Sequence, residues 1–369
     1  MTTHRTATLT DKHAADSQNL GATLKSDNVN QRWVLRNRPA TTISRGDLEF
    51  ETYDLPPLQD GQVRVRNVYL SLDPSQRLWM SEREQYLPPV KVGDVMRGGT
   101  LGVVEESCSD RYRPGDLVSV GLGGWETRTT TDARMITRIQ PVAGVPLTAA
   151  MSVLGTTGLT AYYGITSVGR VEEGETVVIT AAAGAVGSIA GQIAKRLGAR
   201  VIGIAGGPEK CKWLTEDLGF DAAIDYKSED VGEALDRLAP KGIDVDFENV
   251  GGPIMEAIYA RMRRYGRIAL CGQIASYNHE GAVPGPRDFS LVLMRRLHIQ
   301  GFLVMDFLGR AAEAHEVLAP WVTDGSIKWR THVVGGLENA FDALNLLFEG
   351  RNDGKLLVQV SAEPSVGHP

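Results

Sequence analysis

Hydrophobic and polar positions divide the chain into two parts with different periodicities. Between residues 31 and 150, short segments alternate apolar and polar side chains like half-buried strands. The clearest begins at Val63 and reads Val-Arg-Val-Arg-Asn-Val-Tyr-Leu. Further strands are expected at residues 98–106 and 116–121, with a turn at Arg113-Pro-Gly-Asp between them. This part of the sequence predicts a mostly β structure with little helix.

After about residue 151 the pattern changes to strands that alternate with helices. The run Thr176-Val-Val-Ile-Thr is nearly all apolar, as is typical of a strand buried on both faces of a parallel sheet. Further strands are expected at residues 200–205, 222–225, 243–248, 267–271 and 298–304. Helices are expected at residues 186–197, 208–218, 231–238 and 253–264, and a last helix follows the sixth strand and ends at about residue 323. Six strands in this rhythm indicate an α/β fold with a doubly wound parallel sheet.

The chain ends with an expected helix at residues 337–349 and an expected strand at residues 355–360. One helix and one strand cannot form a domain alone, so we expect them to return to the β-rich part. The expected domains are therefore 29–150 joined by 325–369, and 151–324. Residues 1–28 are polar without periodicity, which predicts a flexible extension.

Composition narrows the classes of function. A formal net charge of -6 argues against a nucleic-acid partner, and no run of 18 apolar residues predicts a membrane span. The chain begins without the apolar segment of a secretory signal.

Three scattered cysteines, Cys108, Cys211 and Cys271, favour a reducing cytoplasm. No histidine lies between residues 14 and 278, so we expect no metal site there and a metal-free mechanism.

The most informative segment follows the buried strand and reads Ala181-Ala-Ala-Gly-Ala-Val-Gly-Ser. Its small residues Ala182, Gly184 and Gly187 have the spacing of a dinucleotide fingerprint. Gly184 lets the backbone approach a pyrophosphate, and Gly187 lets the helix pack close to the strand. The N-terminus of that helix offers free amides and a positive dipole end to the anion. A plain glycine-rich turn is the alternative, but the strand before and the helix after favour dinucleotide binding.

The end of the second strand decides between NADH and NADPH. An NADH enzyme places an acid there to bind the ribose 2′-hydroxyl. This chain has Ile204-Ala-Gly-Gly-Pro-Glu-Lys instead, so that Ala205 and Gly206 leave room for a 2′-phosphate and Lys210 can bind it. A lone lysine is more often a solvated helix charge, but the missing acid favours NADPH.

Three more strand ends carry polar groups at the edge where such a fold binds its ligand. Asn249 follows one strand, the loop from Cys271 to Tyr277 follows the next, and the backbone of Phe302–Val304 follows the sixth. Each feature alone has an ordinary reading, as a turn residue or a loop aromatic. Their common position favours a cofactor site.

These residues resemble the zinc-independent medium-chain dehydrogenases/reductases, most closely the NADPH-dependent alkenal double-bond reductases, a group that includes the prostaglandin reductases. The similarity extends from about residue 31 to 360. Its most specific pieces are Leu70-Ser-Leu-Asp-Pro, the glycine loop with Gly191-Gln-Ile-Ala-Lys, Gly219-Phe-Asp with Tyr226-Lys, Asn249-Val-Gly-Gly, Gly266-Arg-Ile-Ala, Cys271-Gly with Ser276-Tyr-Asn, and Asn352 with Gly354-Lys.

The resemblance implies a GroES-like catalytic domain around a Rossmann domain, and a homodimer. It also implies the cofactor-binding set Gly184, Ala185, Val186, Gly187, Lys210, Tyr226, Asn249, Cys271, Gly272, Ile274, Ser276, Tyr277, Phe302, Leu303, Val304 and Asn352. The family usually continues Asp-Pro-Tyr-Met-Arg, whereas here Ser75-Gln-Arg follows Asp73-Pro. Ser75 and Tyr86 are therefore the expected substrate-pocket residues. Because Ser75 is polar and smaller than the tyrosine of the family, the sequence does not fix the size of the substrate.

The expected reaction is NADPH-dependent reduction of the carbon–carbon double bond of an enal or enone. Hydride adds to the β-carbon, and a hydroxyl donor stabilises the enolate oxygen; Tyr277 is the expected catalytic residue. Three alternatives remain at this stage: a quinone reductase, a non-catalytic NADPH-binding sensor and a zinc alcohol dehydrogenase. The last is disfavoured by the missing ligands.

Overall fold

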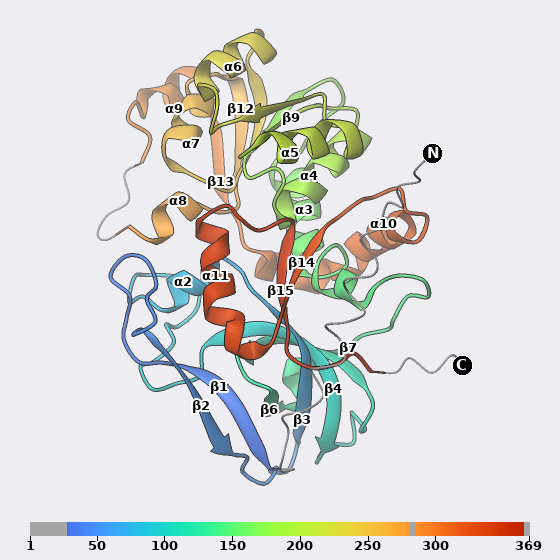
Figure 1. The fold of residues 1–369 in the computed structure, drawn as a ribbon. Helices are drawn as coiled ribbons and strands as arrows, with labels where there is room; N and C mark the ends of the chain where they lie inside the picture. Colours follow the sequence, from blue (N-terminus) through green and yellow to red (C-terminus); the bar gives the residue numbers. More distant parts are fainter. Residues whose placement is uncertain (1–27, 280–284, 365–369) are drawn as a thin grey trace, which may run out of the picture.

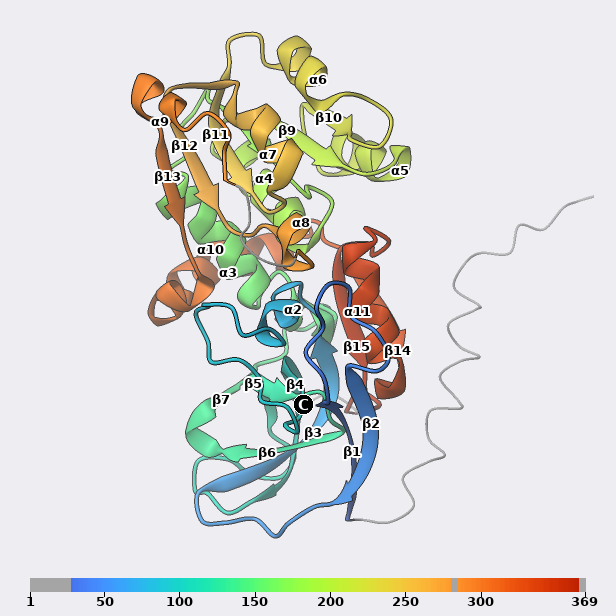
Figure 2. The ribbon, with the colours of Figure 1, turned by 90° about the vertical axis from the view of Figure 1, so that its left-hand side faces the viewer.

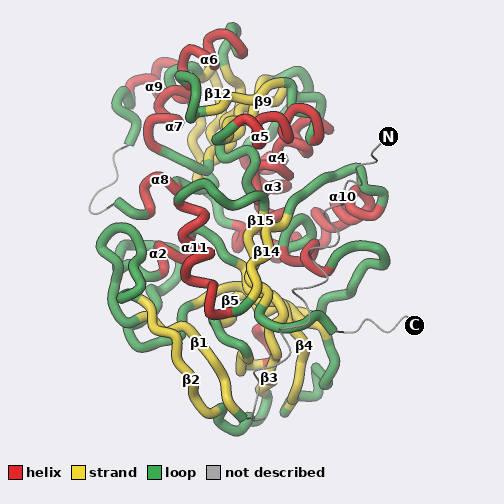
Figure 3. Tube along the Cα trace, viewed as in Figure 1, coloured by secondary structure: helices red, strands yellow, loops and turns green. Residues whose placement is uncertain are grey.

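The structure is a computed structural model that describes residues 28–279 and 285–364 (Figure 1). Most of the expected N-terminal extension, residues 1–27, lies outside the described residues. The chain forms two halves, a helix-covered sheet at the top of Figure 1 and a β-rich half below it; Figure 3 shows the same contrast by secondary structure. No helix among the described residues is both long enough and apolar enough to cross a membrane.

The upper half contains a six-stranded sheet in which every neighbouring pair is parallel. Its strands are β8 (Thr176–Ile179), β9 (Arg200–Ala205), β10 (Ala222–Asp225), β11 (Ile243–Glu248), β12 (Met262–Leu270) and β13 (His298–Gly301). The order is β10-β9-β8-β11-β12-β13, so the direction of winding reverses between β8 and β11. The predicted doubly wound fold is confirmed, and ligands of this fold bind outside the carboxyl ends of the strands at that reversal.

Helices cover both faces of this sheet because both faces are apolar. They are α3 (Thr156–Tyr163), α4 (Ala185–Arg196), α5 (Pro208–Lys212), α6 (Val231–Leu238), α7 (Gly252–Tyr259), α9 (Ser290–Arg295) and α10 (Ala311–Thr323). Val177 and Ile179 pack into one hydrophobic cluster with α3, α4 and α10, whereas Val178 packs into another with α6 and α7. The alternation of these strand residues between two cores explains the uninterrupted apolar run in the sequence.

Two predicted boundaries in this half are wrong. The helix expected at residues 253–264 ends at Tyr259, and Met262 already pairs with Ile243 in the sheet. The strand expected at residues 298–304 ends at Gly301, and Val304 begins a 3₁₀ helix, η5 (Val304–Arg310). In the second case the carboxylate of Asp306 accepts a hydrogen bond from the amide of Leu303, at 3.2 Å, and turns the chain out of the sheet.

The lower half contains the strands β3 (Gln62–Ser71), β4 (Arg97–Ser107), β5 (Leu117–Gly124), β6 (Arg128–Asp132), β7 (Ile136–Arg138), β14 (Thr331–Gly335) and β15 (Lys355–Gln359). Strands β1 (Val29–Leu35) and β2 (Leu48–Asp54) form a separate antiparallel pair. The long sheet has the order β14-β15-β3-β4-β5-β7. The last strand thus returns to the β-rich half, as the sequence predicts, and the helix α11 (Ala340–Phe348) packs on the same half.

A buried lysine fixes the place where the returning strand meets the first half of the chain. The ammonium of Lys355, whose side chain is 3% exposed, donates to the Leu72 carbonyl at 3.1 Å and forms an ion pair with Asp73. Asp73 precedes the short helix α2 (Ser75–Trp79). The ion pair therefore ties the end of the chain to the segment that was expected to face the substrate.

A second buried polar group lies between the two sheets of this half. The carboxyl group of Glu126 accepts hydrogen bonds from the Asn30 amide at 3.2 Å and from the Tyr53 hydroxyl at 3.1 Å. Burial raises the pKa of Glu126 from 4.5 to about 7, because the charged form is poorly solvated there. The folded protein therefore binds this proton more tightly than the unfolded chain does.

We expect the Glu126→Gln variant to lose a specific pH dependence of stability. With a raised pKa in the folded state, wild-type stability falls as pH rises from 4.5 to about 7. The loss is roughly 3 kcal/mol of unfolding free energy over that window. The neutral amide removes this fall, so urea unfolding at pH 5 and pH 8 should give more similar free energies for the variant. The exposed Glu316→Gln serves as the control, and an unchanged slope in Glu126→Gln would contradict the prediction.

Candidate cofactor and substrate site

The glycine loop connects β8 directly to α4 at the point where the sheet reverses. Gly184 is the N-cap of α4 in extended conformation, so the first amides of the helix face outward from the carboxyl edge. A Cβ at Gly187 would lie 2.6 Å from the Ala181 carbonyl oxygen, closer than real atoms approach. Only glycine fits there, as the fingerprint argument requires. Ala181 has a φ of 47°, so the loop also contains one strained residue.

The end of the chain lies against this loop. Gly184 and Gly354 form an isolated parallel bridge, which joins the glycine loop to the segment before β15. Asn352 lies two residues earlier and donates its side-chain amide to the Gly354 carbonyl at 2.9 Å. The predicted cofactor residue Asn352 is therefore brought beside the glycine loop by an element from the other half of the molecule.

Lys210 and Tyr226 lie together at the carboxyl end of β9. A Cβ added to Gly206 would come 2.9 Å from the Tyr226 hydroxyl, so the missing side chain makes room for that phenol. The ammonium of Lys210 donates to the Gly350 carbonyl at 2.9 Å. Burial lowers the pKa of Lys210, and the nearby Lys227 adds to this effect. A second lysine thus stands at this end of the site.

Lys227 is absent from the predicted set, although it follows Tyr226 directly. Its Cε would lie 2.9 Å from a Cβ at Gly206, the same distance as the Tyr226 hydroxyl. The pair Tyr226-Lys belongs to the pieces that resemble the family, but neither its spacing nor the resemblance assigned a role to the lysine. Its position over Gly206 depends on the turn after β10.

Buried polar contacts join the ends of β8 and β11. The carboxyl group of Glu248 accepts hydrogen bonds from the Thr180 hydroxyl at 2.8 Å and from the amides of Val250 and Gly251. Asn249 donates its side-chain amide to the Thr180 carbonyl at 2.7 Å. These contacts fix the two loops on either side of the reversal. Asn249 therefore lies where it was predicted, and its amide cross-links the two strand ends.

The loop after β12 folds over Asn249. The amides of Cys271 and Gly272 both donate to the Glu248 carbonyl, and that of Ile274 donates to the Asn249 carbonyl at 3.1 Å. The short helix α8 (Ile274–Tyr277) follows and includes Ser276. Burial raises the pKa of the Cys271 thiol to about 12, so this cysteine is an unreactive thiol at neutral pH.

The hydroxyl of Tyr277 points back over this loop. It accepts a hydrogen bond from the Gln273 amide at 3.1 Å. Burial raises the pKa of Tyr277 to about 12, and the nearby phenol of Tyr86 contributes to the rise. Tyr277 therefore keeps its proton at neutral pH and can donate it in a hydrogen bond.

Residues of the other half approach Tyr277 from below. Figure 2 shows α2 and α8 facing each other where the two halves meet, and the two helices are in contact. Ser75 is the first residue of α2 and is half-buried. Tyr86 accepts a hydrogen bond from the Trp79 indole at 3.2 Å and lines a cavity of about 450 Å³ formed by residues 82–89. Tyr86 also contributes to the raised pKa of Tyr277, so the two phenols lie near each other, whereas Ser75 is placed only by the contact of α2 with α8.

The segment Phe302–Val304 is only partly arranged as predicted. Phe302 is buried against Phe247, and its amide donates to the Leu270 carbonyl at 3.3 Å. The amide of Leu303 donates to Asp306. Two of the three expected amides are therefore engaged within the chain.

Within the described residues there is also no group of three His, Cys, Asp or Glu side chains arranged to hold a metal ion.

Comparison with known proteins agrees with this geometry. Residues 31–139 match the N-terminal domain of oxidoreductase family, and residues 185–322 match the zinc-binding dehydrogenase family. An NADPH-dependent curcumin reductase of Escherichia coli is 39% identical over 90% of this chain and 98% of its own length. A NADP(+)-dependent 2-alkenal reductase of Nicotiana tabacum is 38% identical over the same shares. A CurA from Vibrio vulnificus, solved with NADPH, is 39% identical with a TM-score of 0.85, over 90% of this chain and all of that one.

The chain belongs to the zinc-independent medium-chain dehydrogenases/reductases, in the alkenal reductase group. The GroES-like and Rossmann halves expected from the resemblance are the two halves of the structure.

The structure adds a residue to this alkenal reductase site that the sequence analysis missed. The guanidinium of Arg77, 2% exposed, donates to the Asn278 side-chain oxygen at 3.1 Å. It also donates to the carbonyls of Pro39 and Thr41, at 2.9 and 2.8 Å. Arg77 thus fastens the residue after Tyr277 to the lower half. Arg77 stands where the family motif Asp-Pro-Tyr-Met-Arg has its arginine, and this match is the one signal in the sequence that points to it.

We expect Arg77→Met to lower kcat/KM for NADPH-dependent reduction by about tenfold. The methionine keeps the apolar stem but removes charge-assisted hydrogen bonds of roughly 1.5–3 kcal/mol. Steady-state kinetics would show the loss, and Tm would report whether the fold is retained.

The Asn278→Ala variant tests whether Arg77 acts by positioning Asn278 or only through its packing in the fold. If Arg77 acts through Asn278, the double variant is no slower than Arg77→Met alone. If the loss of kcat/KM in the double variant is instead the product of the two single losses, the residues act independently and this role is contradicted.

Proposed function

We propose that this protein is an NADPH-dependent reductase of the carbon–carbon double bond of α,β-unsaturated aldehydes and ketones. The observation that carries the proposal is the position of Tyr277 at the carboxyl edge of the sheet, where its buried hydroxyl lies over the loop that follows β12. The names of the similar curcumin and 2-alkenal reductases support it. Quinone reduction with the same cofactor is the alternative outcome of the test below.

The proposed cofactor site follows the carboxyl edge of the sheet. Residues 184–187 face the pyrophosphate with the amides of α4, and Lys210, with Tyr226 and Lys227, faces the 2′-phosphate. The remaining predicted residues line the rest of the cofactor; they are Asn249, Cys271, Gly272, Ile274, Ser276, Tyr277, Phe302, Leu303, Val304 and Asn352. The contacts among these loops support this division of roles. We propose that the lower domain comprises residues 29–150 and 325–369, of which 365–369 lie outside the described residues, and that the cofactor domain comprises residues 151–324.

Bound NADPH supplies the hydride that adds to the β-carbon of the substrate. Negative charge then appears on the carbonyl oxygen, and the protein has to stabilise it. The neutral phenol of Tyr277 is the proposed donor to that oxygen, because its raised pKa keeps the proton in place. Ser75 and Tyr86 form the proposed substrate wall, and no metal takes part.

NADPH oxidation with a panel of enals, enones and quinones tests the proposed activity, with NADH as the cofactor control. We expect turnover with enals or enones and a preference for NADPH, since Ala205 and Gly206 stand where NADH enzymes place an acid and Lys210 follows them. Turnover with quinones alone would refute double-bond reduction. If NADPH binds but none of these acceptors is reduced, the result would favour a non-catalytic sensor.

The Tyr277→Phe variant tests the proposed donor. We expect kcat to fall on the order of 10²–10³-fold, while the Kd of NADPH stays unchanged, because only the enolate loses a hydrogen bond. Stopped-flow hydride transfer and NADPH fluorescence titration measure the two quantities. Tyr112→Phe removes a buried phenol that bonds to the Ile136 carbonyl in the β-rich half, and serves as control. An unchanged kcat in Tyr277→Phe would remove it from the mechanism.

We also propose a homodimer formed through the edge strand β13. Within the described residues only β12 pairs with β13. Large apolar side chains are exposed on both sides of this strand: Phe289, Leu293 and Met294 before it, and Met305 and Leu308 after it. A free strand edge beside exposed apolar surface is typical of an assembly site.

Sedimentation equilibrium tests the dimer. The wild-type chain should have twice its 40.0 kDa mass, and Leu293→Asp should shift the equilibrium toward the monomer. Met135→Asp places the same charge on an equally exposed methionine of the other half, and should remain dimeric. A monomeric wild type would refute the proposal.

A cytoplasmic location is our last proposal. The free thiols of Cys108, Cys211 and Cys271 are consistent with a reducing compartment. Recovery of the protein in a membrane or secreted fraction would contradict this location.

A further inference from the structure

A short turn of the lower half lies against the phosphate end of the proposed cofactor site. It comprises residues 350–354, between α11 and β15, and we call it the strap. At its start, the carbonyl of Gly350 accepts a hydrogen bond from the ammonium of Lys210 at 2.9 Å. At its end, Gly354 forms the bridge to Gly184 of the glycine loop. The strap therefore contacts the cofactor half at both of its ends.

An arginine of the lower half fastens the strap at a third point. Arg330 forms an ion pair with Asp353 at 3.2 Å, and its guanidinium lies 4.3 Å from the centre of the Trp213 ring. A cation over an indole face is attracted by the electrons of the ring. Trp213 directly follows α5, the helix that carries Lys210. The strap is thus joined to the same segment whose lysine is the predicted ligand of the 2′-phosphate.

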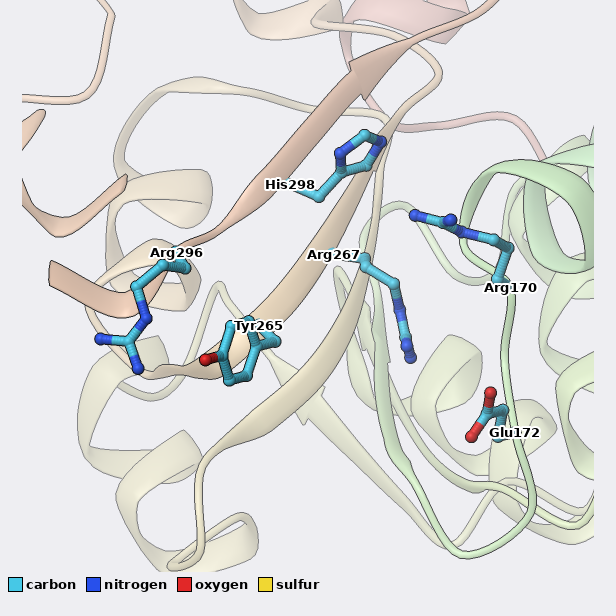
Figure 4. Close-up of a pocket in the computed structure, with 6 residues that line it drawn as sticks. All are labelled: Arg170, Glu172, Tyr265, Arg267, Arg296 and His298. Carbon is cyan, nitrogen blue, oxygen red and sulfur yellow. The ribbon is translucent and has the colours of Figure 1, made fainter. Parts of the chain in front are cut away.

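Two arginines that line a cavity of about 340 Å³ keep their contacts within the cofactor half (Figure 4). Arg267 forms an ion pair with Glu175. Arg296 donates to the Met294 carbonyl at 2.6 Å and lies 4.9 Å from the centre of the Tyr265 ring. These two guanidinium groups stabilise one half of the molecule. The arginine behind the strap instead connects the two halves.

The residue after the strap connects it to the proposed substrate wall. Lys355 follows Gly354, and its buried ammonium pairs with Asp73, two residues before Ser75. The pairing of β15 with β3 holds the two segments together over the residues that follow. The position of the strap on the cofactor half therefore affects the position of the substrate wall.

We propose that Lys210 is a positioning residue as well as a binding residue. It couples the 2′-phosphate of the cofactor to the strap, and so keeps the substrate wall against the cofactor half. The proposal rests on the NADPH site proposed above. An ammonium has three N–H donors and Gly350 accepts one of them, so Lys210 can bind the phosphate and the strap together.

The surroundings of Gly350 support this double role. The hydroxyl of Tyr226, the other predicted phosphate ligand, lies 3.6 Å from the position of a Cβ on Gly350. Both predicted ligands thus lie beside the first residue of the strap. A ligand shifts a conformational equilibrium only through contacts that differ between the two states, and the contact through Lys210 exists only while the halves are together. We therefore expect the 2′-phosphate to raise the rate of hydride transfer at saturating cofactor, besides the affinity.

Hydrogen exchange followed by mass spectrometry tests the coupling without turnover. The full chain is saturated with adenosine 2′,5′-bisphosphate or with adenosine 5′-monophosphate, and peptides that cover residues 349–356 are compared. We expect the bisphosphate to slow their exchange by about threefold more than the monophosphate does, since only the bisphosphate is joined to the strap through Lys210. The Lys210→Met variant should lose this difference at ligand concentrations that still saturate it. Equal protection by the two ligands overturns the coupling alone, whereas a wild type that does not bind the bisphosphate overturns the cofactor site as well.

The Arg330→Met variant tests the effect on the reaction. It removes the contacts with Asp353 and Trp213 and leaves the lysines of the phosphate site in place. At saturating cofactor we expect hydride transfer from NADPH to slow about tenfold and that from NADH to change less than about twofold, while the Kd of the bisphosphate stays within about threefold. Equal slowing with both cofactors, or equal saturated rates with NADPH and NADH in the wild type, overturns the proposal.

Arg138→Met is the matched control. Arg138 also forms an ion pair with an aspartate, Asp116, and its guanidinium lies 5.3 Å from the centre of the Tyr112 ring. Its side chain is 43% exposed, against 42% for Arg330. This arginine lies in the β-rich half and does not contact the strap. The control should match the wild type in both hydride-transfer rates and in the Kd of the bisphosphate, and the Tm of each variant reports whether the fold is retained.

Discussion

The antiparallel pairing of β15 with β3 is the contact on which the rest of the architecture depends. It brings the end of the chain back to the β-rich half, where the buried ammonium of Lys355 meets Asp73 and the Leu72 carbonyl. The segment just before β15 then lies against the glycine loop through Gly354, and Gly350 accepts a hydrogen bond from Lys210. One strand pairing thus places a loop of the lower half against both the glycine loop and Lys210 of the cofactor half.

Two buried acids on β11 of the cofactor half have different surroundings. Glu248 is satisfied at one oxygen by Thr180 and two amides, so it orders the loops at the reversal of the sheet. Two residues earlier on the same face, Asp246 has no hydrogen-bond partner for either oxygen among the described residues, and burial raises its pKa well above the ordinary value. A neutral acid in that place costs less than a charged one would. Glu248 thus orders the loops at the carboxyl edge, whereas Asp246 favours its neutral form there.

The sequence predicted which residues lie at the carboxyl edge of the sheet because strand ends carry their residues to the same side in any parallel sheet. Gly187, Lys210 and Asn249 needed only the strand order to come together. The failures were at the boundaries of elements and in contacts between halves. The helix expected to reach residue 264 stops at Tyr259, since pairing with Ile243 draws Met262 into the sheet. Arg77 and Lys227 were missed, since their roles depend on Asn278 and Gly206, which are distant in sequence.

By itself the sequence determined the two halves, the doubly wound order of strands and helices, the preference for NADPH and the family. These properties follow from periodicity and from local spacing, both of which depend only on residues that are close in the sequence. Only the tertiary structure decided how Tyr277 is held, which side chains join the halves, and that Arg170, Tyr265, Arg267, Arg296 and His298 line one cavity. Those residues lie up to about 130 positions apart, and side-chain contacts at such separations depend on packing that no local pattern encodes.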